Sequence, residues 1–449
     1  MSQDLKDLSQ KIIDKALAKG AEQCEVLSHK ARTLSLKADS GSIEEHKISS
    51  TSLAGVRLKK DGKIGISYTE KLDDEGQDIL IQSALDSAKY KKADEFENIL
   101  TPGDGKVRDG TCDSTWQEDH STDEEKVNLA LKLESDVLGK DKRIRKSPYN
   151  GFREVEAESF LANHLGLFKT VKGRSFSAYT SALAEENGKS ALHWHSSTAL
   201  RFKDLDISEC CDVASRHALQ LLKGDLIPTK SYPVIFDTDT FSEVFGCFMS
   251  VFSAKAAIDK NNPWADLLGK KVATNQLSVL DHPTYAMGLS YQTWDGEGTE
   301  CQPVDLIKNG VLENFLQNSS TASQMGLTNN ARAARSAKGP LGVSSTHMII
   351  SKGTQSESEL YAGECLEIIG VDGLHSGSEF ISGNFSFGAS GYLKKDGQVV
   401  QVVKGITVSG NFYELLNQIE ALGSNLHANS SRDLFAPLIR FEKVSVGGN

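Results

Sequence analysis

The sequence predicts an α+β protein, in which an N-terminal region of helices and antiparallel strands precedes a β-rich C-terminal domain with few helices. Three observations predict this fold class. Helical and strand periodicities alternate over residues 1–225, a segment with two prolines follows at 224–233, and short strands with glycine turns fill most of 226–449. A chain of 449 residues is long enough for two or three domains, so we place the main boundary between 225 and 226.

The first elements are a helix, a hairpin and a second helix. Apolar residues recur every three or four positions over 4–19, as one buried helix stripe requires. Segments 52–59 and 63–68 flank Asp61-Gly62, a pair suited to the positive φ angles of a tight hairpin. Helical spacing returns over 81–88. These signals predict two helices packed on an antiparallel sheet.

The middle of the chain opens with a turn-rich stretch, 98–121, which we interpret as a connecting loop and a secondary boundary. Thr122 and Glu125 have capping-box spacing and predict a helix that runs to about residue 138. Residues 154–202 alternate about the turn Asn187-Gly188, which predicts a meander of antiparallel strands. A helix is expected over 208–222.

Beyond residue 233 we expect strands and only two helices. One is predicted over 241–257. The other is predicted over 412–422, because Asn411 and Glu414 have capping-box spacing, Leu415 to Leu422 carries one apolar stripe, and Gly423 follows as a stop signal.

Composition excludes several classes of function. The charges, 50 Lys+Arg and 61 Asp+Glu, give a net −11 that repels phosphate backbones and anionic lipid, so no nucleic-acid or membrane partner is expected. No apolar stretch is long enough to span a bilayer, and the N-terminus lacks a signal-peptide pattern. Seven scattered cysteines form neither a disulfide framework nor a zinc ribbon. The prediction is a soluble, cytoplasmic protein.

Few residues suggest catalysis. The chain has no H-E-x-x-H, G-x-S-x-G, P-loop or Rossmann motif. His193 and His195 would share one face of a strand and could form a metal pair, although a half-buried structural strand is the simpler interpretation. Asp295 and Glu297 lie in a glycine loop that could hold a cation, but a solvated turn is favoured because hard cations need more oxygen ligands.

The order of three longer segments resembles the TldD/PmbA family of metallopeptidases, and most of all its PmbA branch, also called TldE. The carrying segments are YQTWDGEGTECQPVDLIKNGVLENFLQNSSTASQMGL, SGNFSFGASGYLKKDGQ and GNFYELLNQIEALGSNL. The resemblance covers nearly the whole chain. It implies that a TldD-type sibling carries zinc on an H-E-x-x-x-H segment and a late cysteine, and that the two subunits together cleave unfolded peptides, among them an antitoxin and a microcin precursor.

By this resemblance the matching segment here is Ser242-Glu243-Val244-Phe245-Gly246-Cys247, in which Ser242 and Cys247 replace the two histidines. Near the C-terminus Ser430-Ser431 stands where a cysteine would be expected. A catalytic zinc normally has three protein ligands and a bound water. We therefore expect a degenerate site, with no catalytic residue and no metal or other cofactor in this chain. The structural alternatives are a first-turn helix acid for Glu243 and a core thiol for Cys247.

Three functions remain open from the sequence. The preferred one is a non-catalytic, TldE-like subunit that pairs with a TldD-like sibling, or forms a homodimer, and handles unfolded peptides. The second is independent catalysis, either by a metal held by His193, His195 and a distant carboxylate or by Cys247 as a nucleophile. The third is a regulatory protein-binding module.

Overall fold

The computed structural model describes residues 2–99 and 110–449, and both parts of the predicted α+β fold are present. The N-terminal part is built on an eight-stranded sheet with the order β3-β2-β1-β6-β7-β4, to which β5 and β8 add by pairing with β7. Its strands are β1 (Gln23–Asp39), β2 (Ser42–Lys60), β3 (Lys63–Thr69), β4 (Gly110–Thr115), β5 (Ile144–Lys146), β6 (Gly151–Asn163), β7 (Phe168–Glu186) and β8 (Lys189–Ala199).

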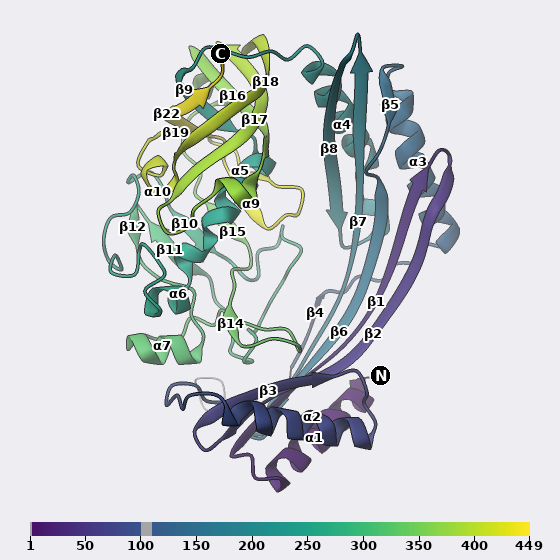
Figure 1. The fold of residues 1–449 in the computed structure, drawn as a ribbon, viewed down its shortest axis with the longest axis vertical. Helices are drawn as coiled ribbons and strands as arrows, with labels where there is room; N and C mark the ends of the chain where they lie inside the picture. The colour runs from purple at the N-terminus through teal and green to yellow at the C-terminus, as the bar shows by residue number, and fades with distance from the viewer. Residues whose placement is uncertain (1, 100–109) are drawn as a thin grey trace.

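Two pairs of helices cover the ends of this sheet. They are α1 (Ser2–Ala18) and α2 (Asp74–Lys89) at one end, and α3 (Asp123–Gly139) and α4 (Ile207–Leu221) at the other. Figure 1 shows the long strands running between the two pairs. Each pair buries its own apolar cluster against the strands, and the α3–α4 cluster also includes Ile369 and Tyr392 from the C-terminal half. A third small cluster packs Ala130 of α3 against the strand residues Leu34, Leu36, Phe152 and Phe176.

The central part of the β1–β2 hairpin is uncovered. Residues 44–51 of β2 are all exposed, so neither face of the strand is packed there. Strand β3 pairs with β2 only from Ala54 onward. Within the described ranges no other strand pairs with the outer edge of 42–53, which leaves a long free strand edge.

The C-terminal half contains two six-stranded sheets and a small hairpin. One sheet has the order β18-β17-β16-β9-β22-β19, and an additional pairing between β18 and β22 closes it into a barrel. Its strands are β9 (Lys230–Phe236), β16 (Glu364–Asp372), β17 (Asn384–Lys395), β18 (Gln398–Asn411), β19 (Ile419–Leu422) and β22 (Ile439–Gly447). The largest apolar cluster of the protein lies inside this half.

The second sheet has the order β12-β11-β10-β15-β21-β20. Its strands are β10 (Val279–Asp281), β11 (Val304–Lys308), β12 (Val311–Leu312), β15 (Met348–Ile350), β20 (His427–Ala428) and β21 (Leu434–Ala436), and the hairpin is β13 (Ala333–Ala334) with β14 (Gly342–Val343). The helices of this half are short: α5 (Thr238–Phe248), α6 (Ala254–Ile258), α7 (Ser319–Met325), α8 (Glu357–Leu360), α9 (Leu374–Gly377) and α10 (Phe412–Leu415).

The structure confirms most of the N-terminal helices and turns that were predicted from short sequence motifs. The hairpin turns at Asp61-Gly62 and Asn187-Gly188 have positive φ angles at both residues, and Thr122 forms the predicted capping box with Glu125. The sequence reasoning missed β1 and its hairpin with β2. The loop predicted at 98–121 contains β4, and its residues 100–109 lie outside the described part of the chain.

The helix predicted over 412–422 is wrong. Asn411 does cap α10 through the amides of Tyr413 and Glu414, but the helix ends at Leu415. Residues 419–422 instead form β19, which pairs with β22. A helix or a strand at this place would bury the same apolar residues. The strand also satisfies its backbone N–H and C=O groups by hydrogen bonds to β22. The helix predicted over 241–257 is broken into α5, a 3₁₀ turn at Met249–Phe252 and α6, because Ser253 starts a new N-cap.

None of the described helices is long and apolar enough to cross a membrane.

Candidate functional site

The site predicted from the sequence lies on α5, directly after the barrel strand β9. Asp237 caps this helix by accepting a hydrogen bond of 2.7 Å from the amide of Thr240. Four apolar side chains at helical spacing anchor the opposite side of the helix in the main core: Phe241, Val244, Phe245 and Phe248. The polar side of α5 is therefore directed away from the core.

A segment near the C-terminus closes over the start of α5. Ser430 donates its amide and its hydroxyl to the Asp239 carboxylate, over 2.6 and 2.8 Å. Asn429 donates from Nδ2 to Ser242 Oγ over 3.0 Å. The tertiary fold thus brings together the two sequence regions that the resemblance singled out, α5 and the segment around Ser430.

The polar side of α5 faces a cavity of about 230 Å³ between the edge of β8 and the barrel. Its titratable and hydroxyl-bearing walls include His193, His195, Asp237, Asp239, Glu243 and Ser430. His195 Nδ1 lies 3.8 Å from Asp239 Oδ2, which joins the N-terminal sheet to α5 across the cavity. The strand therefore does place both histidines at one cavity, as their spacing predicted.

Carboxyl groups in this cavity hold protons more tightly than usual. Burial, with the nearby charges of Asp237, Asp239 and Asp372, raises the pKa of Glu243 to about 7. Burial likewise raises the pKa of Asp237 to about 6. Because these pKa values lie near neutral pH, Asp237 and Glu243 can release or take up a proton there and could act as a general acid or base.

Two histidines beside the cavity, His193 on β8 and His217 on α4, are held neutral. Burial lowers the pKa of His193 to about 4 and that of His217 to about 3. Their ring centroids lie 4.7 Å apart with the ring planes tilted by 56°, and His217 Nδ1 shares a hydrogen bond of 2.6 Å with the Tyr392 hydroxyl. This contact makes a structural role the better account of His217.

Of the three residues predicted at the degenerate motif, only Glu243 lines the cavity. Ser242 is engaged with Asn429, and Cys247 is directed to the packed side, where Sγ donates to the Glu243 carbonyl over 3.4 Å. Glu243 is not the first-turn acid that the structural alternative expected, because α5 begins at Thr238 and its first-turn acid is Asp239. Cys247 is half-buried at the border of the core.

These side chains do not fit a catalytic zinc. Such an ion needs about three converging nitrogen, sulfur or carboxylate ligands. Two of the three ligand positions implied by the resemblance are occupied by the serines Ser242 and Ser430. Both hydroxyl groups already form hydrogen bonds within the chain, to Asn429 and Asp239. Across the described residues, no three His, Cys, Asp or Glu side chains are grouped so that they could hold a metal ion.

A thiol mechanism is also poorly supported by the geometry. Burial raises the pKa of the Cys247 thiol, whereas a nucleophilic cysteine needs a lowered value. The same cysteine does not line the cavity that contains His193 and His195.

The Asp295–Glu297 loop is not the solvated turn that we expected. Asp295 and Glu297 are 1% and 8% exposed. The Asp295 carboxylate accepts hydrogen bonds from the amides of Glu297, Thr299 and Ala333, while Glu297 accepts from the amide and hydroxyl of Ser319. The oxygens that a cation would need thus organise the loop instead.

Sequence reasoning missed Asp237 and Asp239 as cavity residues. A signal was present, because an aspartate directly after an apolar strand and before a helix is a typical N-cap. The capping role alone, however, does not reveal that the carboxylates face His195.

Comparison with known proteins agrees with this architecture. Residues 24–88, 116–222 and 229–448 match, in turn, domain 1, the central domain and the C-terminal domain of the PmbA/TldA metallopeptidases. The chain is 24% identical over 432 residues to Metalloprotease PmbA of Escherichia coli O157:H7, covering 96% of this chain and 94% of that protein. It is 22% identical over 435 residues to the Metalloprotease PmbA homolog of Haemophilus influenzae, with 96% and 93% covered.

Solved structures share the fold. A proposed modulator of a DNA gyrase from Thermotoga maritima superimposes with a TM-score of 0.88 at 24% identity, covering 98% of this chain and all of that one. TldE from Thermococcus kodakarensis superimposes with a TM-score of 0.82 at 19% identity, again covering 98% of this chain and all of that one. The three consecutive domain matches, together with full-length relatives, establish that this chain belongs to the PmbA/TldD metallopeptidase family.

Proposed function

We propose that this chain is a non-catalytic, TldE-like subunit of a cytoplasmic zinc-peptidase assembly that acts on unfolded peptides. The observation that carries the proposal is the engagement of Ser242 and Ser430 in hydrogen bonds within the chain, at two of the three implied ligand positions. Neither residue has a strong zinc donor atom, and Cys247 is turned away from the cavity. Without an activated water, Glu243 has no nucleophile to deprotonate.

A partner subunit is supported by the free edge of β2. Residues 44–51 expose both faces and one backbone edge, a state that proteins usually avoid by covering or blocking the edge. A sibling subunit, or a second copy, that adds a strand here would satisfy those backbone groups. The exposed Ile48 would be buried by the same contact.

Peptide binding is supported by β8, which lies along the candidate cavity. In the part of the chain that the structure describes, β8 pairs with β7 alone, so its outer edge can accept another strand. Backbone hydrogen bonds made in this way depend little on sequence, which suits unfolded substrates.

The proposal is tested by zinc content and peptide cleavage. The chain by itself should carry far less than one zinc and cleave no peptide, whereas mixing it with a sibling that has H-E-x-x-x-H should give cleavage. Chelator-sensitive cleavage by the unmodified chain would overturn the proposal.

A further inference from the structure

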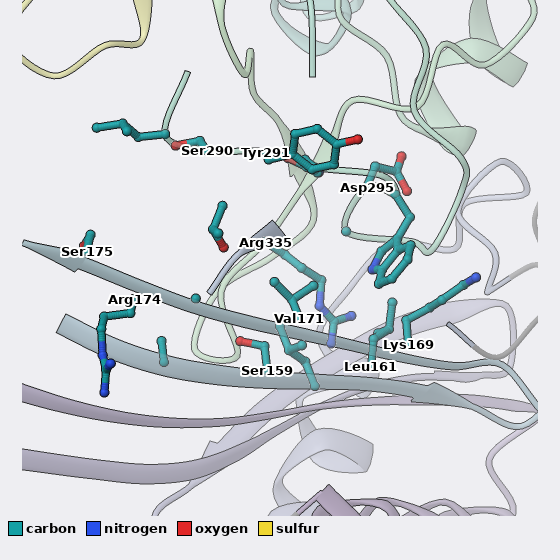
Figure 2. Close-up of a pocket in the computed structure, with 18 of the residues that line it drawn as sticks. Ser159, Leu161, Lys169, Val171, Arg174, Ser175, Ser290, Tyr291, Asp295 and Arg335 are labelled. Carbon is teal, nitrogen blue, oxygen red and sulfur yellow. The ribbon is translucent and has the colours of Figure 1, made fainter. Parts of the chain in front are cut away.

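A second cleft, of about 440 Å³, lies between a face of the N-terminal sheet and the segment 289–296 of the C-terminal half. Its floor includes Leu161 and Val171 from neighbouring strands, and its opposite wall includes Tyr291 and Trp294. Figure 2 shows Tyr291 and Asp295 above the strands and Arg335 reaching down toward them. The cleft is therefore largely apolar, and both halves of the protein build it.

Three cationic side chains line the same cleft: Lys169, Arg174 and Arg335. Arg174 is paired with Glu156. Lys169 places Nζ 4.8 Å from the centroid of the Trp294 ring. Arg335 has only 4% of its side chain exposed, and its Nη1 donates to Glu25 Oε1. Arg57 Nε donates to the same oxygen over 2.9 Å, so two guanidinium groups share one carboxylate. Arg57 also lies 3.9 Å from Glu97 Oε1 and 3.9 Å from Glu297 Oε1, so three carboxylates surround these two guanidinium groups.

Arg335 also has an unused donor. Its Nε is buried, and no hydrogen-bond acceptor for it is found among residues 2–99 and 110–449. A buried N–H without a partner is unfavourable, and an anionic oxygen is the strongest acceptor that could serve it. The nearby Asp295 and Glu297 do not serve it, because amide and hydroxyl donors elsewhere engage their oxygens.

The cleft is held in a fixed shape by the loop that carries Arg335. Lys338 forms an ion pair of 2.9 Å with Glu70 on the N-terminal part. A Cβ atom at Gly55 would lie only 1.8 Å from the Ala337 carbonyl oxygen, so the loop and β2 approach as closely as a glycine allows. A ligand would thus meet a preformed site.

We propose that this cleft binds the C-terminal end of a peptide, with the terminal carboxylate toward Lys169 and Arg335 and an apolar side chain against Tyr291 and Trp294. The choice of a peptide rests on the proposed function. It is also supported by the hydroxyls of Ser159, Ser175 and Ser290, which line the cleft and can bond peptide amides. The Ser159 hydroxyl already shares a hydrogen bond of 2.9 Å with His29 Nδ1, so the hydroxyls that a purely aliphatic chain would leave without a ligand partner are those of Ser175 and Ser290.

The test uses the full-length chain and an N-terminally fluorescein-labelled peptide, Ala-Ala-Phe-Leu, as the free acid and as the C-terminal amide. Fluorescence polarisation should show saturable binding of the acid and at least about tenfold weaker binding of the amide. Equal affinity for acid and amide, or no saturable binding of the acid up to about 1 mM, would overturn the proposal.

Variants locate the site. Lys169→Met should lower affinity for the acid to that for the amide while leaving amide binding unchanged, and Lys169→Arg should restore the difference. Val171→Trp should block both peptides by filling the cleft, whereas Ile79→Trp, an exposed aliphatic position on α2 outside the cleft, should bind as the unmodified chain does. Binding by Val171→Trp at normal affinity would place the peptide elsewhere and overturn the proposal.

A competition experiment distinguishes a peptide ligand from a fatty-acid ligand. Decanoate should compete more weakly than unlabelled acetyl-Ala-Ala-Phe-Leu acid, and stronger competition by decanoate would overturn the assignment to a peptide. These measurements need no sibling subunit. The mixing experiment could therefore fail while the cleft still binds peptide acids. Conversely, the mixing experiment could succeed while the polarisation assay shows no binding in the cleft.

Discussion

Ser430 holds the Asp239 carboxylate with both its amide and its hydroxyl, although the two residues are 191 positions apart. Hydrogen bonds to a charged acceptor are stronger than neutral ones. This pair fixes the C-terminal segment against the first turn of α5 and shapes the cavity that His195 closes from the other side.

Loss of the Ser430 hydroxyl should therefore weaken the fold. Ser430→Ala removes one charge-assisted bond and should lower the free energy of unfolding by about 1–2 kcal/mol, measured by urea denaturation. Ser431→Ala, at the exposed neighbouring position, is the matched control and should change it by less than about 0.5 kcal/mol. Equal effects in the two variants would contradict a specific role for the Ser430–Asp239 contact.

Glu243 should make stability fall as pH rises. Its pKa is raised from 4.5 to about 7, so between these values the folded chain keeps a proton that the unfolded chain has lost. Glu243→Gln imitates the protonated form. It should be neutral at pH 5 and stabilising at pH 8 by about 1 kcal/mol, a figure reduced for the partial exposure of the side chain.

Denaturant unfolding at both pH values measures this difference. Glu118→Gln, an exposed position away from the cavity, should show the same stability change at pH 5 and pH 8. A Glu243→Gln variant without a pH-dependent gain would mean that the carboxyl group ionises normally.

His193 should act in the opposite direction. Burial lowers its pKa from 6.5 to about 4, so the stability that depends on a neutral ring is complete above pH 6.5 and is lost as pH falls toward 4. His193→Gln should flatten the acid side of a plot of melting temperature against pH. His120→Gln, at an exposed position, should leave that slope unchanged.

Charges on the free edge of β2 should prevent association. Ile48→Lys combined with Ser50→Lys places two cations beside the exposed backbone, a device that blocks strand pairing. We expect the dissociation constant for the partner to rise at least about tenfold, measured by sedimentation velocity, with little change in thermal stability. Ser358→Lys, on the exposed surface of α8, is the control. Unchanged association would exclude this edge as the contact.

The ion pair between Arg332 and Asp281 should be important for the C-terminal half. Both side chains are almost completely buried, at 1% and 0% exposed, and Arg332 also donates to the carbonyls of Asn330, Ala331 and Gln302. Arg332→Met leaves Asp281 buried without its cation and should cost about 3–5 kcal/mol, measured by urea denaturation. The double variant Arg332→Met with Asp281→Asn should recover part of this loss.

Features that depend on neighbouring residues could be predicted from the amino-acid sequence. Asp61-Gly62 and Asn187-Gly188 form hairpin turns because few other pairs adopt two positive φ angles, and Thr122 caps α3 because Glu125 lies three residues on. The chemistry of Ser242 and Cys247 could be read from the sequence as well, and their assignment to the positions of the expected histidines stays a prediction from the family resemblance.

The contacts between distant segments depend on long-range packing and could not be predicted in this way. Residues 419–422 satisfy a helical pattern, yet pairing with β22 makes them a strand. Asp295 looked like part of a solvated turn, but the approach of Ala333 buries it. His195, Asp239 and Ser430 converge through a sheet, a helix and a C-terminal loop, and no local spacing encodes that meeting. Periodicity reports which residues will be buried, whereas the partner that buries them is chosen by long-range packing and backbone pairing.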